Sequence, residues 1–293
     1  MKAEEKRLLH SFFLTASQAI EGFCLPSHVA SSSVHFVDDV EFADKLKPEE
    51  MFSSNNLGDS AFSVLCDVEN VSASSSSIIE NKRYLSLDEI KADIVGCTLC
   101  PLYKTRRNVV AGEGPKEVCD SKNAPSILVI GEAPGFDEDA MARPFVGASG
   151  KLLDKMLAAI QLSRSTNCFI TNMVKCRPPD NRNPTPLELS CCSHFLHEQI
   201  RLIAPKMILL LGSVALKAMF HTTEGIMHLH GKLMHYKMNI CRNENVDEEK
   251  KEISIPTIPT YHPSALLRNE SLKRPAWDDL KFFKAKLKEI MLS

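Results

Sequence analysis

Four cysteines have the residue type and spacing of a metal site. Cys97 and Cys100 are separated by two residues, which lets both thiolates reach one ion or cluster. By itself, this pair fits zinc, a redox disulfide or an iron–sulfur cluster. A four-thiolate site needs two further ligands, and Cys176 and Cys192 complete a Cys-x2-Cys-x75-Cys-x15-Cys pattern.

The wider cysteine content favours metal binding over disulfides. The chain has ten cysteines, and its first residues (MKAEEKRLLHSFFL) lack the features of a secretory signal. Thiols in a reducing compartment are used for metals or packing. A zinc ribbon normally has a second Cys-x2-Cys pair, which this sequence lacks, and four unrelated buried thiols are the other alternative. Cys191 competes with Cys192, but neighbouring helical residues point about 100° apart, so we expect only one to face the site.

A second set of residues that could bind a ligand or take part in catalysis follows short apolar runs. The first run ends in Gly131-Glu-Ala-Pro-Gly135, a rigid turn in which backbone N–H groups can approach a ligand. Glu138 and Phe145 come next, and simple packing is the alternative for this phenylalanine. Asn172 ends the second run, where its amide can both donate to and accept from the edge of a base.

The segment Tyr261–Arg268 follows the last apolar run and suits contact with DNA. His262 is held by the proline after it, although an ordinary surface histidine is the alternative for this residue alone. Leu266 and Leu267 are expected to enter a duplex and fill the gap left by a flipped base. Arg268 is expected to hold a phosphate.

The apolar runs alternate with helical segments, which implies a parallel sheet covered by helices on both faces. The predicted fold is therefore α/β, a three-layer α/β/α sandwich with a central four-stranded parallel sheet. Ligands of such sheets bind beyond the carboxyl ends of the strands, where the unusual residues lie. The expected strands are Ser126–Gly131, Cys168–Asn172, Lys206–Gly212 and Thr257–Tyr261; the expected helices are one capped by Ser86 and ending at Gly96, then Ser149–Ile160, one from Thr185 to Ile203, Ser213–Phe220 and Leu272–Met291.

Residues 1–84 differ from the remainder of the chain. Serine clusters at 31–33, 53–54 and 74–77, with scattered acids and little periodicity, predict a mostly disordered leader before a folded body over residues 85–293. Residues 1–90 carry 7 Lys and Arg against 15 Asp and Glu, whereas residues 91–293 carry 28 against 22. A mildly basic body suits an anionic partner. Polar residues 115–124 and 239–254 are expected to be surface insertions.

Together, these motifs resemble the family-4 uracil-DNA glycosylases, the iron–sulfur branch of that superfamily. The resemblance covers the chain from about Leu85 to the C-terminus. It departs from the family pattern in the leader and the two insertions, which leaves targeting and extra partners open. The motifs that carry it are Cys-x2-Cys at 97–100, Gly-Glu-Ala-Pro-Gly at 131–135, Arg-Pro-Phe-Val-Gly at 143–147, Thr-Asn-Met-Val-Lys-Cys-Arg-Pro-Pro at 171–179 and His-Pro-Ser-Ala-Leu-Leu-Arg at 262–268.

The resemblance implies an enzyme of base excision repair. Its reaction is hydrolysis of the N-glycosidic bond of deoxyuridine in DNA, which leaves an abasic site. It further implies that Phe145 stacks on the flipped uracil, that Asn172 reads its pairing edge and that His262 stabilises charge on the departing base. The resemblance also implies a pocket lined by the backbone around Glu132 and Ala133, and a hydrogen-bonded pair of Glu138 and Asn181 that helps organise the catalytic loop or its water. The last implied feature is a structural [4Fe–4S] cluster on Cys97, Cys100, Cys176 and Cys192.

The expected partner is uracil-containing DNA, single- or double-stranded. The protein is expected to be a monomer that does not associate with membranes. The expected location is the cytoplasm for a bacterial source, and the nucleus or an organelle for a eukaryotic one. One alternative is a non-catalytic iron–sulfur module related to polymerase-associated domains, although Phe145, Asn172 and His262 are all present. Another is a glycosylase for a different deaminated base, such as hypoxanthine.

Overall fold

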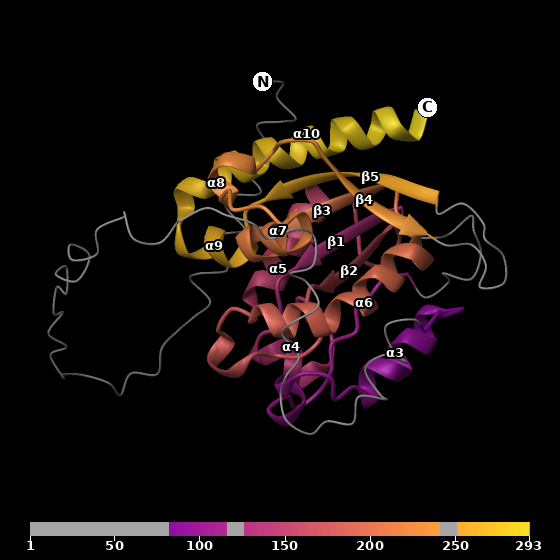
Figure 1. Ribbon diagram of the computed structural model, residues 1–293. Coiled ribbons are helices and arrows are strands. Elements are labelled where there is room, and N and C mark those ends of the chain that lie inside the picture. The colour runs from indigo at the N-terminus through magenta and orange to yellow at the C-terminus, as the bar shows by residue number, and fades with distance from the viewer. Residues whose placement is uncertain (1–81, 116–125, 241–250, 293) are drawn as a thin grey trace, which may run out of the picture. The chain divides into compact units, whose positions relative to one another are not determined.

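The computed structural model describes residues 82–115, 126–240 and 251–292 of the chain (Figure 1). The expected leader lies outside the described residues, apart from its last three positions. One of these, Tyr84, is fully buried and donates a hydrogen bond to Asp93 at 2.9 Å, so the packed core includes a residue that we had assigned to the leader. Among the helices described, none combines the length and apolar character needed to cross a membrane.

Five strands form one sheet in the order β2-β1-β3-β5-β4. The four parallel strands are the expected ones: β1 (Ile127–Gly131), β2 (Cys168–Asn172), β3 (Met207–Leu211) and β5 (Lys251–Thr260). The fifth strand, β4 (Met234–Ile240), pairs antiparallel with β5 at the edge of the sheet. The predicted α/β sandwich is therefore confirmed, but its sheet has five strands rather than four.

Strand β4 carries a sequence signal that was missed. Met234, Tyr236 and Met238 pack against the core, whereas His235 and Lys237 between them are exposed. This alternation is typical of a half-buried edge strand. The charged residues that follow led to the prediction of a surface insertion over 239–254, whose two ends belong instead to the β4–β5 hairpin.

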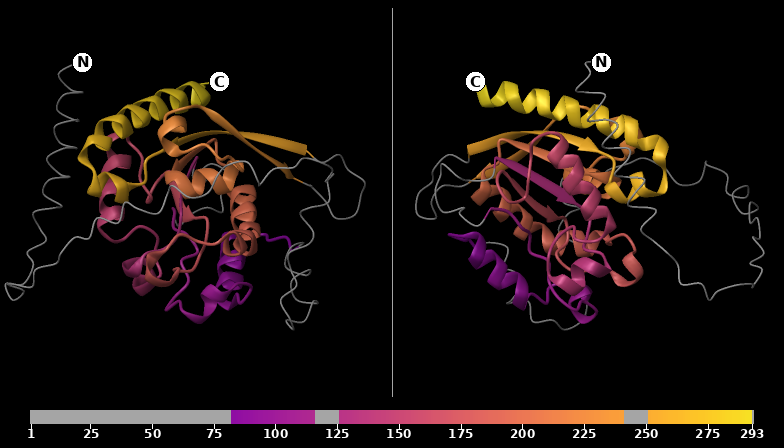
Figure 2. Two further views of the ribbon diagram at one scale, coloured as in Figure 1. Left: turned by 60° about the vertical axis from the view of Figure 1, so that its left-hand side comes forward. Right: turned by 180° about the vertical axis from the view of Figure 1, so that it is seen from behind.

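Helices cover both faces of the sheet (Figure 2). Side chains alternate along a strand, so Ile127 and Val129 pack against one group of helices and Leu128 and Ile130 against the other. The two faces therefore have separate hydrophobic cores. The first is covered by α5 (Ala148–Ala159), α9 (Pro263–Arg268) and α10 (Lys273–Leu292), and the second by α6 (Pro186–Ile203), α7 (Gly212–Phe220) and α8 (Ile226–Leu229).

Local capping fixes the helix boundaries that the sequence predicted well. Thr185 caps α6: its side chain accepts a hydrogen bond from the Glu188 amide at 3.3 Å, and the Glu188 carboxylate accepts one from the Thr185 amide at 2.8 Å. Ser86 caps α3 (Leu87–Gly96) in the same way, by accepting from the Glu89 amide. Two short helices, α9 and α4 (Phe136–Met141), occupy segments that were expected to be loops.

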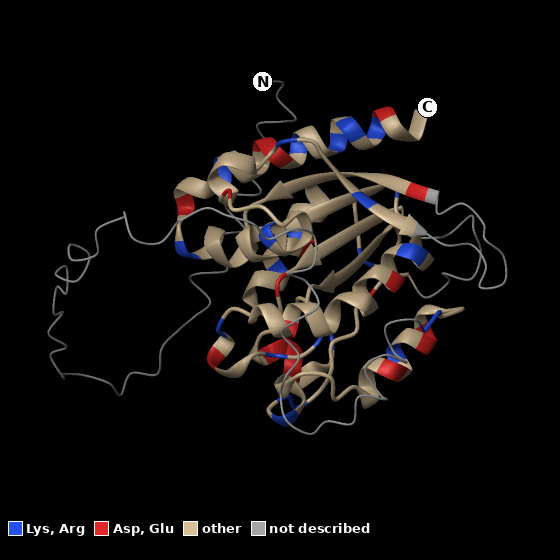
Figure 3. Ribbon diagram, in the orientation of Figure 1, with Lys and Arg blue, Asp and Glu red and all other residues tan. Residues whose placement is uncertain are grey.

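Charged residues are distributed over the helices without separation by sign. In Figure 3, Lys and Arg are interspersed with Asp and Glu, most clearly along α10. The mild positive balance of residues 91–293 is thus not visible as a single basic face in this view.

Candidate functional site

A cleft of about 580 Å³ lies at the carboxyl ends of the parallel strands. The segments after β1, β2, β3 and β5 all contribute to its walls, which is where ligands of parallel sheets bind. The chain runs from β1 to β2 on one side and returns to β3 on the other, so the cleft lies where the strand order reverses. Its lining includes eight residues singled out from the sequence: Glu132, Ala133, Glu138, Phe145, Asn172, Asn181, His262 and Arg268.

Asn172 presents an unpaired hydrogen-bond acceptor to this cleft. The side chain is 1% exposed, and its Oδ1 atom has no hydrogen-bond partner among the described residues. A Cβ atom on the neighbouring Gly131 would lie 2.4 Å from this oxygen and 2.5 Å from the ring of Phe145, so the glycine leaves room for both groups. An unsatisfied buried acceptor costs about 1–3 kcal/mol. The arrangement indicates that a ligand supplies the donor.

Phe145 lies in the cleft on a strained backbone. Its φ is +52°, in the left-handed region that bulky residues rarely adopt. Gly150 makes this conformation possible, since a Cβ atom there would overlap the carbonyl group of Phe145. The guanidinium group of Arg164 donates to the carbonyl oxygens of Pro144 at 2.7 Å and Phe145 at 2.8 Å. These contacts hold the backbone from which the ring projects into the cleft.

Glu138 holds the same loop from the other side. Its Oε1 accepts hydrogen bonds from the amides of Val146 at 2.8 Å and Gly147 at 2.9 Å. Its Oε2 accepts from the amide of Gly135 at 3.1 Å. Three charge-assisted bonds commit this carboxylate to the backbone. The geometry therefore gives Glu138 a positioning part rather than a place beside a reacting water.

The expected hydrogen-bonded pair of Glu138 and Asn181 is not formed between these described residues. Asn181 is exposed, and its Oδ1 instead accepts from Nε of Arg177 at 2.7 Å. The Arg177 guanidinium also lies over the ring of Phe136, 5.2 Å from its centre. Both Asn181 and Glu138 line the cleft, but Asn181 lies at its exposed rim while Glu138 is engaged with the loop.

His262 caps α9 and is neutral at pH 7. The amide of Ser264 donates to its Nδ1 at 3.2 Å, so in the neutral ring the hydrogen resides on Nε2. Burial, together with the nearby charge of Arg268, lowers the pKa of His262 to about 4. The ring centre lies 5.7 Å from that of Phe145. His262 therefore offers Nε2–H as a neutral donor to a ligand beside the phenylalanine.

The three residues expected to enter or hold DNA lie in different surroundings. Leu266 is fully buried in the core beneath α9, and Leu267 packs partly against the same core. A helix forms over this segment, which turns the first leucine inward. Entry of Leu266 into a duplex would require α9 to leave the core, so its expected role does not fit this structure. Arg268 is exposed and lines the cleft, where it can meet a phosphate.

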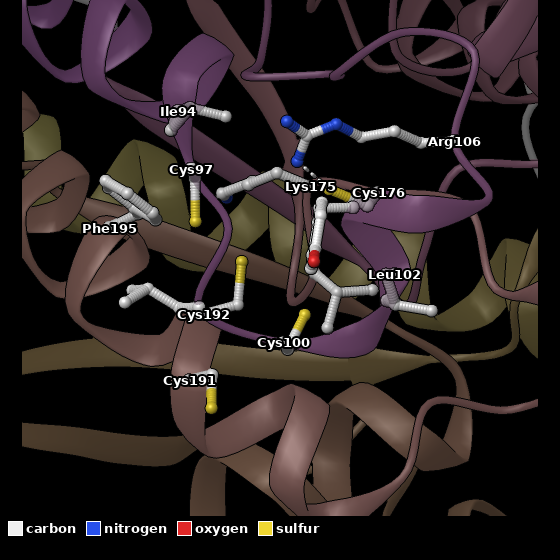
Figure 4. Close-up of a pocket in the computed structure, with 13 residues that line it drawn as sticks. Ile94, Cys97, Cys100, Leu102, Arg106, Lys175, Cys176, Cys191, Cys192 and Phe195 are labelled. Atoms are coloured by element: carbon white, nitrogen blue, oxygen red, sulfur yellow. Dashed lines mark hydrogen bonds between the residues drawn. The ribbon is translucent and has the colours of Figure 1, made fainter. Parts of the chain in front are cut away.

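The four cysteines named from the sequence line one small cavity (Figure 4). Cys97 follows α3, Cys100 precedes a short 3-10 helix, Cys176 lies in the loop after β2 and Cys192 lies in α6. Their sulfur atoms point toward a common centre in Figure 4, whereas the sulfur of Cys191 points away from it. The fold thus brings thiols from segments distant in the sequence to one cavity.

The thiols of this cavity are buried, and a cationic side chain lies beside them. Burial raises the pKa of Cys100 to about 11 and that of Cys192 to about 12, so these thiols keep their protons at neutral pH unless a metal displaces them. Arg106 donates to the sulfur of Cys176 at 3.2 Å. Within the described ranges, no three His, Cys, Asp or Glu side chains are arranged to hold a single metal ion.

Lys175 is a candidate functional residue that the sequence analysis did not single out. It is 1% exposed, and its ammonium group donates to Thr171 Oγ1 at 2.7 Å, to the carbonyl oxygen of Asn172 at 2.7 Å and to Gln199 Oε1 at 2.8 Å. Burial lowers its pKa to about 8, and the nearby thiols of Cys192 and Cys176 oppose this shift. The one feature of the sequence that could have indicated its burial is its place between a buried strand and Cys176.

Comparison with protein families connects the cleft with a known superfamily. The family model described as the Uracil DNA glycosylase superfamily matches residues 118–281, more than half of the chain. This range contains every cleft residue discussed above. It also contains two of the converging cysteines, Cys176 and Cys192.

Individual relatives extend this likeness. The chain is 39% identical to the type-4 uracil-DNA glycosylase of Sulfurisphaera tokodaii over 209 residues, which are 71% of this chain and 86% of the relative. It is 40% identical to the type-4 uracil-DNA glycosylase of Thermotoga maritima over 197 residues, 66% of this chain and 90% of the relative. A DNA polymerase of Bacillus phage SP01 is 29% identical over 140 residues, 47% of this chain but 14% of the polymerase.

Proposed function

Because the chain belongs to the uracil DNA glycosylase superfamily, we propose that it is a DNA-repair enzyme that flips uracil out of DNA and hydrolyses its N-glycosidic bond. The observation that carries this proposal is the buried, unpaired Oδ1 of Asn172. Uracil presents an N3–H donor between two carbonyl oxygens. The Asn172 amide can accept from N3–H and donate to the adjacent oxygen, whereas cytosine offers an acceptor at N3 and leaves Oδ1 unpaired.

The other cleft residues supply stacking and charge stabilisation. The ring of Phe145 provides a surface for the face of the base, and the neutral His262 directs Nε2–H at its O2 atom. When the C1′–N1 bond breaks, the electron pair goes to the base, and O2 gains negative charge. A fixed donor at that atom stabilises the transition state, a term typically worth about 10²–10³-fold in rate.

The water step has no strong general base in this proposal. Glu138 is committed to three backbone amides, and Asn181 binds Arg177. The sugar left behind is an oxocarbenium ion, which water can attack without prior activation, releasing its proton to solvent. The product is an abasic sugar and free uracil. Glu138 serves this reaction by fixing the Phe145 loop.

DNA is the proposed partner, and arginines at the rim of the cleft are the proposed phosphate contacts. Arg268 and Arg182 both line the cleft and are exposed, and the guanidinium of Arg182 also binds the Glu188 carboxylate at 2.7 and 2.9 Å. Phosphate contacts fix the register of a protein on DNA without reading its sequence. Specificity for the damaged base then comes from the pocket, after the nucleotide has been extruded from the strand.

The test is a glycosylase assay on a panel of oligonucleotides containing uracil, hypoxanthine or xanthine, single- and double-stranded, with alkaline cleavage at abasic sites as the readout. We expect cleavage of the uracil substrates, with weaker or absent cleavage of the purines, which are larger than the pocket's implied ligand. Selective cleavage of a purine substrate would favour another deaminated base. Binding without cleavage of any substrate would favour a non-catalytic module.

We further propose that Cys97, Cys100, Cys176 and Cys192 hold a [4Fe–4S] cluster. Four thiols that line one cavity, with sulfur atoms directed toward its centre (Figure 4), support a cluster in which each thiolate binds a different iron. The cluster would supply a brace between α3, α6 and the loop after β2. That loop begins at Asn172, so the brace supports the pocket rather than the chemistry.

Replacing Cys176 with serine is expected to remove the absorption band near 400 nm and to lower the bound iron. The thermal unfolding midpoint should fall because three buried segments lose their common tie. Cys191→Ser is the matched control, since its sulfur points away from the cavity in Figure 4. Iron content and absorption of both variants decide the matter. Full iron in Cys176→Ser, or loss of iron in Cys191→Ser, would contradict the ligand assignment.

A further inference from the structure

The ammonium group of Lys175 connects the two sites of the domain. Its side chain lines the cysteine cavity (Figure 4), while its Nζ reaches the main chain of Asn172 at 2.7 Å. An ammonium group has three donors, and all three are used: the other two go to Thr171 Oγ1 and Gln199 Oε1. Such a saturated, buried cation is rigidly placed.

The acceptors around Lys175 are themselves tied to one backbone position. Gln199 Nε2 donates to the carbonyl oxygen of Ala111 at 2.6 Å, and Thr171 Oγ1 lies 3.2 Å from the same oxygen. Thr171 and Gln199 are almost wholly buried. The ammonium group of Lys175 therefore links strand β2, helix α6 and the segment that contains Ala111.

The contact with Asn172 bears on base recognition. Asn172 ends β2, and the next amide, that of Met173, donates to the carbonyl oxygen of Gly131 at 2.9 Å. The carbonyl oxygen of Asn172 accepts its hydrogen bond from Lys175. The Asn172 side chain projects from this backbone, so the bond from Lys175 holds the position from which the amide reaches into the cleft.

We infer that Lys175 is a positioning residue for recognition of the base, acting through the main chain of Asn172. The inference rests on the proposed function and adds to it a residue that does not touch the substrate. A misplacement of about 1 Å in a reading group can cost about 100-fold in rate. Loss of the ammonium should therefore impair recognition of the base more than binding of the DNA backbone.

The test compares Lys175→Met with a control variant, Lys273→Met. Lys273 is also buried, but its ammonium group binds Glu270 away from the cleft. We expect Lys175→Met to lower kcat/KM for uracil release about 100-fold, while its affinity for abasic-site DNA, which presents no base, matches that of the control. Iron content and absorption near 400 nm should remain. If iron and activity are lost together, Lys175 serves the cluster and the inference is overturned.

A double-mutant cycle with Asn172→Ala separates positioning from general support of the fold. If Lys175 acts through Asn172, then Lys175→Met should cause little further loss once the asparagine is gone. Additive losses in ln(kcat/KM) would overturn the inference. Should Lys175→Met fail to fold, Lys175→Gln enters the same cycle, since it keeps a donor on a shorter side chain. An inactive wild-type enzyme would overturn the proposed function and this inference together, whereas unimpaired Lys175 variants of an active enzyme overturn the inference alone.

Discussion

Asn172→Ala is expected to lower kcat/KM for uracil release by about 100-fold or more, because both hydrogen bonds to the pairing edge of the base are lost. Single-turnover rates on a single-stranded uracil oligonucleotide measure this effect without the cost of opening a duplex. Asn239→Ala, which removes an exposed asparagine from β4, is the matched control and should retain the wild-type rate. Near-full activity of Asn172→Ala would show that the pocket has been wrongly assigned.

The same substitution should affect stability far less than activity. The Oδ1 atom of Asn172 has no partner among the described residues, so its removal takes away an unsatisfied acceptor rather than a stabilising bond. We expect urea unfolding to give a free energy close to that of the wild type, in contrast to the activity. A large loss of both would instead mean that Asn172 mainly supports the fold. A large loss of activity with little loss of stability is expected of a residue whose main role is to bind the ligand.

Sequence reasoning succeeded where the determining interactions are local. The Thr185-Pro-Leu-Glu188 segment contains both halves of its capping box, so α6 was placed correctly from four residues. The apolar runs of β1, β2 and β3 are continuous because both of their faces are buried, and this pattern is readable in any sequence. Which of Cys191 and Cys192 faces the cavity (Figure 4) depends on the orientation of α6 about its axis, which the sequence alone does not give.

Sequence reasoning failed where tertiary packing determines the surroundings of a side chain. Leu266 looks like an exposed wedge in the sequence, but a short helix turns it into the core. Glu138 was expected to pair with Asn181, but its partners are backbone amides, which no side-chain motif reveals. Lys175 was passed over because lysines are almost always exposed, and only the meeting of β2 with α6 buries this one. Each error concerns what a side chain faces, which depends on contacts distant in the sequence.

His262→Ala is expected to lower kcat by about 10²–10³-fold, the typical cost of losing one donor to a developing anion. His262→Gln provides an amide donor on a similar reach and should recover part of that loss. Rapid-quench measurement of base release separates this effect from the release of product. If His262→Ala retains wild-type kcat and only KM rises, the residue binds the base without stabilising its departure.

The pH dependence gives an independent check on the neutral state of this histidine. Burial lowers its pKa to about 4, against about 6.5 in an unfolded chain. Between these values the unfolded chain binds the additional proton, so acidification from about pH 6.5 to pH 4 favours unfolding, and the stabilisation is fully present above pH 6.5. The free energy of unfolding of the wild type should therefore fall more steeply over this interval than that of His262→Gln. The kcat profile should show no inflection near pH 6.5; an inflection there that disappears in His262→Gln would mean that the ring becomes charged in the working enzyme.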